Sequence, residues 1–298
     1  MKLIETLTEE YVQVQESVQQ IICSNESIKK LQNIWSYIET GTKTFCDERD
    51  VYDFLADKIE NFSIQNITAE DISSFCIQQT LRKETPEYFG FFLSAIINKH
   101  FEETKYNETY QLVTKYFKQR IAGLGFLNET KLFIQGDCRY IGSYMKNGKI
   151  TIEGNCADVG ERMSGGDLIV NNERPVYFAG NQMSGGNILI HHDCANIGHA
   201  MQGGTILIEG NGDDNVGFQQ EGGYIIIKGF AGKFLGREKK GGTIEVHEET
   251  GSFMGHLMED GVIHVHQEIS ELKQNPLRIS SSIKGGEIYS KGIRVYPK

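Results

Sequence analysis

Glycine recurs at a nearly constant interval through the second part of the chain, and this interval constrains the fold more than any other feature. The recurring glycines are 18 to 20 residues apart, at Gly148, Gly166, Gly186, Gly204, Gly223, Gly242 and Gly261. A short segment of alternating apolar residues follows each glycine, as in residues 149–154 and 205–210. Strand-length repeats of this period, with glycine at the corners, are typical of a β-solenoid.

Equivalent positions of successive solenoid turns stack into columns about 4.8 Å apart. The sequence predicts that two residues of each strand point inward, from Ile150 and Ile152 in one turn to Ile263 and Val265 in a later one. Another expected core column precedes the glycines and comprises Met145, Met163, Met183, Met201, Gln220, Lys239 and Met258. Cys138, Cys156 and Cys194 form a third column, expected to consist of small buried side chains rather than reactive thiols.

Large aliphatic side chains also occupy the outward position between the two inward ones. In four consecutive turns this position holds Ile169, Leu189, Leu207 and Ile226. Solvent is an unfavourable environment for such a stripe, so we expect it to be a docking surface. Either the N-terminal helices or another subunit, including a second copy of the chain, would cover it.

Four polar residues near the end of the same face have spacing suited to a divalent metal. Glu245 and His247 alternate on one predicted strand, and His264 and His266 alternate on the next. Alternation places both side chains of each pair on one side of the sheet, and stacking brings the two pairs together. Imidazole and carboxylate groups are common zinc ligands, although a solvated polar face would show the same pattern.

The first part of the chain has helical periodicity and almost no glycine. Apolar stripes at Tyr11, Val14, Val18 and Ile21, and again from Ile28 to Ile38, predict two helices. Further helices are expected over residues 47–62, from a capping-box start at Thr68, over residues 88–100 and over residues 108–121. We therefore expect an α-helical bundle in residues 1–125 and a β-solenoid of about seven coils in residues 126–298.

The repeat motif resembles that of the GXGXG family. It is carried by Met163-Ser-Gly-Gly, Met183-Ser-Gly-Gly and Met201-Gln-Gly-Gly, and the resemblance covers about residues 129–298. The family includes the C-terminal domain of the glutamate synthase large subunit and one of the subunits of formylmethanofuran dehydrogenase. The resemblance implies a right-handed parallel β-helix that braces catalytic domains or subunits, and it supplies no catalytic or cofactor-binding residue. The glutamine amidotransferase, flavin and iron–sulfur domains of glutamate synthase are absent here, and residues 1–125 match neither protein.

Composition narrows the functional classes. The formal net charge is −10 and no basic patch occurs, which argues against nucleic acid as a partner. No apolar run approaches the 18 residues typical of a membrane span, and the start of the chain lacks the features of a signal peptide. Six cysteines without a paired motif favour reduced thiols. We therefore expect a cytoplasmic protein.

These observations favour a non-catalytic scaffold that positions a partner enzyme, such as an oxidoreductase or amidotransferase subunit. One alternative is a metal-dependent enzyme that uses Glu245, His247, His264 and His266. Another is an enzyme resembling the hexapeptide acyltransferases, but their coils of fixed length require an aliphatic residue about every six positions. A third is an acidic binding module that mimics nucleic acid, which the moderate charge makes the weakest of these.

Overall fold

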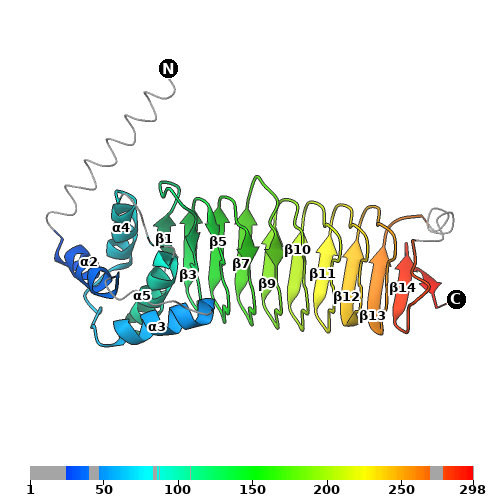
Figure 1. The fold of residues 1–298 in the computed structure, drawn as a ribbon, viewed down its shortest axis with the longest axis horizontal. Coiled ribbons are helices and arrows are strands. Elements are labelled where there is room, and N and C mark those ends of the chain that lie inside the picture. The colour runs from blue at the N-terminus through cyan, green and yellow to red at the C-terminus, as the bar shows by residue number, and fades with distance from the viewer. Residues whose placement is uncertain are drawn as a thin grey trace, which may run out of the picture.

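The computed structural model describes residues 25–39, 47–82, 86, 88–107, 109–268 and 278–297. In this part of the chain a small helical region of four helices precedes a β-solenoid of about eight turns (Figure 1). The helix expected around Tyr11–Ile21 lies outside the described residues. None of the described helices combines the length and the apolar character that crossing a membrane requires.

The helices begin where local capping chemistry allows. They are α2 (Glu26–Glu39), α3 (Glu48–Glu60), α4 (Ala69–Gln79) and α5 (Phe89–Thr104). The Asp47 carboxylate accepts a hydrogen bond from the backbone N–H of Asp50 at the start of α3. At the start of α4, Thr68 and Asp71 form the predicted capping box, in which each side chain accepts from the backbone of the other.

Aromatic side chains fill the core of the helical region. The Trp35 ring centroid lies 5.1 Å from that of Phe89 and 4.7 Å from that of Phe92, and all three residues are buried. Gly90 lets α5 approach the solenoid, because a Cβ at this position would lie 2.1 Å from the carbonyl oxygen of Ala122. The helical region and the solenoid therefore share one continuous core.

A buried hydrogen-bonded chain joins the helical region to the first solenoid strand. His100 in α5 donates from Nε2 to the carbonyl oxygen of Ile67 over 2.7 Å. Its Nδ1 then accepts from the hydroxyl of Tyr110 over 2.6 Å. Burial lowers the pKa of His100, which favours the neutral ring that this arrangement requires.

One long sheet runs the length of the solenoid. Its ten parallel strands are β1 (Thr109–Val113), β3 (Lys131–Gln135), β5 (Lys149–Glu153), β7 (Asp167–Asn171), β9 (Asn187–Ile190), β10 (Thr205–Ile208), β11 (Tyr224–Ile227), β12 (Lys240–Val246), β13 (Asp260–Val265) and β14 (Glu287–Ser290). Strand β15 (Ile293–Tyr296) pairs antiparallel with β14 and ends the sheet. Two short pairs lie elsewhere on the turns, β2 (Ile121–Ala122) with β4 (Cys138–Arg139) and β6 (Asp158–Val159) with β8 (Phe178–Ala179).

The helix expected over residues 108–121 is wrong, because this segment contains β1. Tyr110 and Leu112 are buried and pair with Leu132 and Ile134 of β3. The apolar residues of this segment also fit a helical spacing, but pairing with the next turn outweighs that local preference. The solenoid sheet thus begins at Thr109, inside the range that the sequence pattern indicates to be helical.

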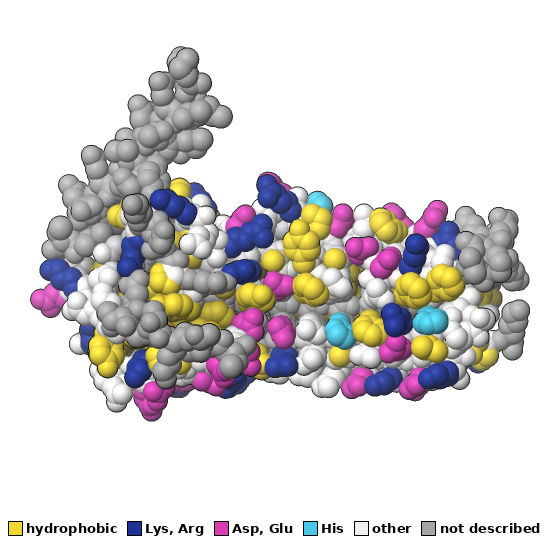
Figure 2. Space-filling model, in the orientation of Figure 1, with side chains coloured by type: hydrophobic (Ala, Val, Ile, Leu, Met, Phe, Trp, Pro, Cys, Tyr) yellow, Lys and Arg dark blue, Asp and Glu magenta, His cyan; other side chains and the backbone are white. Residues whose placement is uncertain are grey.

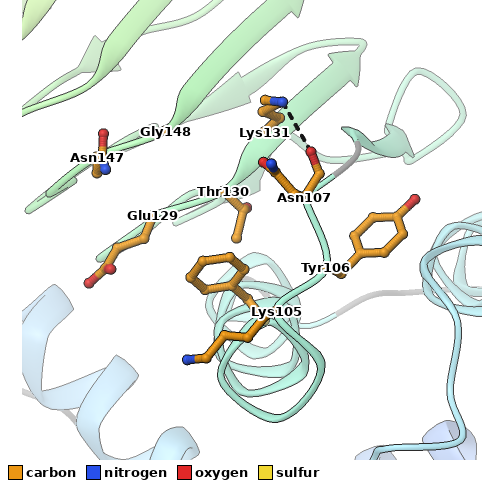
Figure 3. Close-up of a pocket in the computed structure, with 9 residues that line it drawn as sticks. Lys105, Tyr106, Asn107, Glu129, Thr130, Lys131, Asn147 and Gly148 are labelled. Carbon is orange, nitrogen blue, oxygen red and sulfur yellow. Dashed lines mark hydrogen bonds between the residues drawn. The ribbon is translucent and has the colours of Figure 1, made fainter.

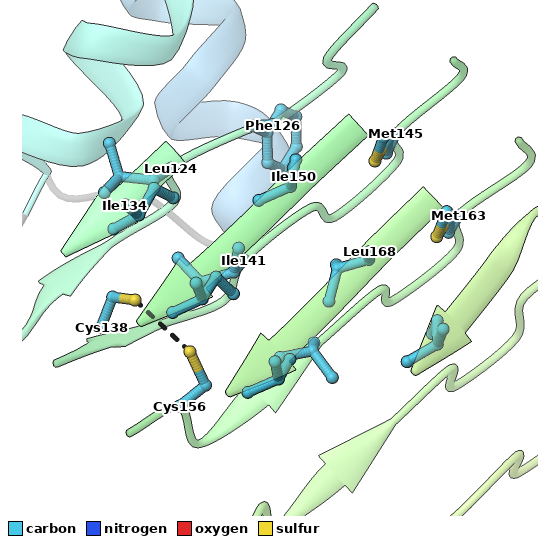
Figure 4. Close-up of a cluster of buried hydrophobic side chains, with 14 of the residues drawn as sticks. Leu124, Phe126, Ile134, Cys138, Ile141, Met145, Ile150, Cys156, Met163 and Leu168 are labelled. Atoms are coloured by element: carbon cyan, nitrogen blue, oxygen red, sulfur yellow. Dashed lines mark hydrogen bonds between the residues drawn. The ribbon is translucent and has the colours of Figure 1, made fainter. Parts of the chain in front are cut away.

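The predicted core columns are confirmed. Every inward strand residue from Ile150 to Val265 named by the repeat is buried, as are the methionine column and the three cysteines. Figure 4 shows the first turns of these columns, where the side chains of Cys138 and Cys156 point toward each other. Their sulfur atoms are 3.4 Å apart. Burial raises the pKa of Cys194, and a hydrogen bond with Cys138 together with burial raises that of Cys156. These thiols therefore serve as packing groups.

The methionine column has two polar members in successive turns. Gln220 and Lys239 are both fully buried. The Lys239 ammonium nitrogen donates to Gln220 Oε1 over 3.0 Å and to the carbonyl oxygen of Gly241. Burial lowers the pKa of Lys239 to about 7, against a weaker opposing effect from Asp260. A polar pair thus replaces two methionines without leaving the lysine unpartnered.

Candidate functional site

A single outward column runs along the middle of the long sheet. Strand register places in it, turn after turn, Thr151, Ile169, Leu189, Leu207, Ile226, Glu245, His264 and Tyr289. The four aliphatic members, which we call the aliphatic column, are each half-buried. The structure therefore brings together all four residues of the predicted docking stripe, side by side on neighbouring strands.

The described helices lie at one end of the solenoid rather than over this column. Helix α4 packs against β1, and α5 packs against β2. Figure 1 shows the helices gathered beside the first turns, far from β9, β10 and β11. The expectation that the helices fold back along the stripe is wrong for the helices that the structure describes. Their aromatic core and the His100–Tyr110 link hold them against the first turn instead.

The later end of the same face carries the predicted metal-binding residues, and three of the four meet. Glu245 Oε1 lies 3.1 Å from His247 Nε2 and 3.0 Å from His266 Nε2. One ligand atom from each of these residues lies within 4.8 Å of the others. The two imidazole centroids are 4.7 Å apart.

His264 does not join this group. It pairs in register with Glu245, as the repeat predicts, but its ring faces Tyr289 on the other neighbouring strand, with centroids 5.0 Å apart. Tyr289 lies beyond the irregular 25-residue repeat, so the sequence period does not align it with His264. The His264 ring therefore packs against Tyr289 and is not among the three residues whose ligand atoms lie close together.

The electrostatics of the cluster favour an ionised carboxylate. Partial burial acts to raise the pKa of Glu245, but the hydrogen bonds and charges of His266 and His247 outweigh it and lower that pKa. The side chains of Glu245, His247 and His266 are 36%, 41% and 50% exposed, so a small ion has direct access from solvent. The cluster is thus a compact set of one carboxylate oxygen and two imidazole nitrogens on two adjacent turns.

A related pair occupies the same edge of the sheet three turns earlier. His191 Nδ1 lies 2.6 Å from Glu209 Oε2, and Lys228 Nζ lies 2.8 Å from Glu209 Oε1. The third member of this group is Lys228, and not a second histidine as in the Glu245 cluster. His191 is therefore a useful control for the His247–His266 cluster.

A row of flat side chains along a corner of the solenoid is a feature that the sequence analysis did not identify. His199 and Phe218 stack with centroids 5.0 Å apart, and the Arg237 guanidinium lies 5.1 Å from the Phe218 centroid. They line a cavity of about 170 Å³ together with Phe178, Asn196 and Asn215. Figure 2 shows histidine, hydrophobic and basic side chains following one another along this side. Each residue of the row directly follows a corner glycine, and this periodic position is the signal that could have found it.

Another cavity lies where α5 meets the first turns. It has a volume of about 460 Å³ and is lined by Phe101, Lys105, Tyr106, Asn107, Glu129, Thr130, Lys131, Asn147 and Gly148 (Figure 3). The Lys131 ammonium donates to the Asn107 carbonyl oxygen over 3.0 Å, and Glu129 lies 3.6 Å from Lys146. Its lining mixes both charges with amides and aromatic rings and does not select one ligand chemistry.

Comparisons with known proteins do not extend this description. No protein-family model matches the chain, and searches of curated proteins and of solved structures find no match. The fold and the surfaces described above define a parallel β-solenoid protein with a helical N-terminal region. The observations that bear on function are therefore the arrangement and chemistry of the residues described above.

Proposed function

We propose that this chain is a non-catalytic scaffold that docks a partner enzyme on the aliphatic column of its solenoid. The observation that carries the proposal is the alignment of Ile169, Leu189, Leu207 and Ile226 on the outer face of four consecutive strands. The described helices lie beside the first turns and do not cover this face. Contiguous apolar surface of this kind marks protein interaction sites.

The surroundings of the column fit an interface between proteins. Polar and charged side chains border it on both sides, among them Asp167 and the Glu209–Lys228 ion pair. Tyr224, next to the column on β11, is 59% exposed. An apolar centre with a polar rim, and with tyrosine available as an anchor, is the usual composition of a specific interface. The flat surface of a parallel sheet would suit a partner of similarly flat shape.

We assign the solenoid to the GXGXG type and its winding to the right-handed class as part of this proposal. The Met-Ser-Gly-Gly repeats support the assignment, and crossovers between parallel strands of one sheet are right-handed in nearly all proteins. By this resemblance the partner would be an oxidoreductase or amidotransferase subunit. The solenoid would brace that subunit and take no part in its chemistry.

The test is isolation of the native chain from its own cells, followed by native mass measurement. We expect a fixed-ratio complex with an enzyme subunit, and we expect the double variant L189D/L207D to lose it. The control is T151D, which places one aspartate in the same column outside the aliphatic members. Thermal unfolding of both variants establishes that they remain folded.

Two results would overturn the proposal. One is a fixed-ratio complex that survives in L189D/L207D, which would move the interface elsewhere. The other is a homo-oligomer that L189D/L207D converts to a monomer, which would make a second copy the occupant of the column.

A further inference from the structure

Three donor atoms at the later end of the outward face have the composition and spacing of a transition-metal site. We propose that Glu245, His247 and His266 bind one zinc ion, through one carboxylate oxygen and two imidazole nitrogens. This inference concerns the chain alone and does not depend on a docked partner.

The donor set selects the class of ion. Two imidazoles with one carboxylate suit zinc and neighbouring first-row metals, whereas Ca²⁺ and Mg²⁺ prefer sites made of oxygen ligands. Sites with two histidines and one glutamate commonly leave a fourth position for water or an exogenous ligand. Because all three side chains are partly exposed, that fourth position faces solvent.

The two carboxylate–imidazole distances require little adjustment on binding, and all three ligand atoms lie within 4.8 Å of one another. A tetrahedral zinc ion with bonds of about 2.0–2.1 Å holds its ligand atoms about 3.4 Å apart. Glu245 Oε1 is already 3.1 Å from His247 Nε2 and 3.0 Å from His266 Nε2. Zinc would replace the proton on each Nε2, which would pass to Nδ1 of the same ring or to solvent, and each imidazole nitrogen would move a few tenths of an ångström away from the carboxylate oxygen.

Backbone pairing holds the ligands in place. Glu245 and His247 are two residues apart and point to the same side, while the pairing of Val246 with Val265 places His266 beside His247. The intervening Val246 and Val265 are buried in the solenoid core. Glu245 therefore lies in β12, and His247 and His266 directly follow β12 and β13, where their backbone N–H groups still donate to Ile227 and Val246 of the preceding turns.

The experiment is a titration of the full chain, purified without a polyhistidine tag, with zinc chloride in an isothermal calorimeter. We expect one zinc per chain, with affinity at least tenfold lower in H247A, in H266A and in E245Q. Two controls each remove a histidine outside the cluster: H191A, from the His191–Glu209 pair, and H264A, whose ring faces Tyr289. Both should bind zinc as the unaltered chain does.

Three outcomes would overturn the assignment. The first is no binding by the unaltered chain. The second is equal binding by H247A and the unaltered chain, which would show adventitious surface binding only. The third is loss of binding in H191A or H264A equal to that in H247A. Metal-free thermal unfolding of each variant separates loss of ligands from loss of fold.

Discussion

The inward and outward faces of the long sheet share one backbone but follow different rules. In β10, Ile206 and Ile208 point inward and are fully buried, while Leu207 between them points outward and is half-buried. The inward positions hold Ile, Leu or Val in every turn of the repeat from Ile150 to Val265. The outward column changes from Thr151 through four aliphatic residues to Glu245 and His264.

This difference indicates that the inward positions determine the fold, whereas the outward positions can vary without changing it. The inward columns fill a narrow, dry interior, so only residues of similar size and polarity fit at each level. The outward column has no such constraint, because the strand register is fixed from the other side. One backbone support thereby presents an apolar column in its middle turns and a Glu–His–His cluster near its end.

The largest difference in stability between the two faces is expected from substitutions at neighbouring residues of strand β10. I206A removes a fully buried side chain between two turns and should lower the free energy of unfolding by about 4 kcal/mol. L207A, one residue away on the outer face, should lower it by less than about 1 kcal/mol. Chemical denaturation of both variants measures the difference, and equal losses would break the distinction between the faces.

The next largest effect is expected at a polar residue of the inward columns. Lys239 occupies a methionine position, so K239M removes a buried amine, together with its hydrogen bond to Gln220, and supplies the side chain found in most other turns of the column. We expect K239M to raise the free energy of unfolding at pH 7 by about 3 kcal/mol, because the folded state disfavours the protonated lysine. The matched control is M258L, which changes a methionine of the same column. G261A would not serve as a control, because its Cβ would lie 2.6 Å from Lys239 Nζ.

The same lysine predicts a pH dependence with a definite sign. Burial lowers the pKa of Lys239 to about 7, whereas the unfolded chain holds this proton to a pH of about 10. Between these values the unfolded state binds more protons, so stability should rise with pH. The stability difference between K239M and the unaltered chain should therefore shrink from pH 7 to pH 10. A difference that stays constant over this range would contradict the assigned pKa.

A smaller effect is expected where the inward face meets the helices. Y110F keeps the buried ring of β1 but removes the hydroxyl that donates to His100 Nδ1. The orphaned nitrogen should reduce the free energy of unfolding by about 1.5 kcal/mol. Y224F, on the exposed face of β11, should leave stability within about 0.5 kcal/mol of the unaltered chain in the same denaturation experiment.

The smallest effect lies outside the solenoid. T68A removes the side-chain oxygen that accepts from the backbone N–H of Asp71 at the start of α4. The loss should be about 1 kcal/mol, and T68S should recover most of it. Thermal unfolding provides the measurement, and a neutral T68A would show that the cap adds little beyond the packing of α4 on β1.

Much of the solenoid could be predicted because its signal repeats. The alternation in residues such as Ile206 to Ile208 recurs with one period, so each turn confirms the register of the next. The same register is enough to predict that His266 lies beside His247. The aliphatic column followed from the outward position alone.

The remaining features depend on contacts that a repeat does not encode. The segment containing Tyr110 precedes the glycine pattern and has helical spacing, so only its pairing with β3 identifies it as a strand. Spacing alone groups His264 with the metal ligands, because it does not reveal Tyr289 as the partner of that ring. The position of the helices depends on the His100–Tyr110 link and on Gly90, which sequence patterns do not connect.

Covalent footprinting of aliphatic side chains is the most direct test of whether a partner docks on the aliphatic column. Radical labelling of the complex isolated from its own cells is compared with labelling of the purified chain. We expect protection of Leu189 and Leu207 in the complex, while exposed Ile293 at the far end of the solenoid is labelled equally in both. Equal labelling of Leu189 and Leu207 in the two samples would contradict a partner docked on the aliphatic column.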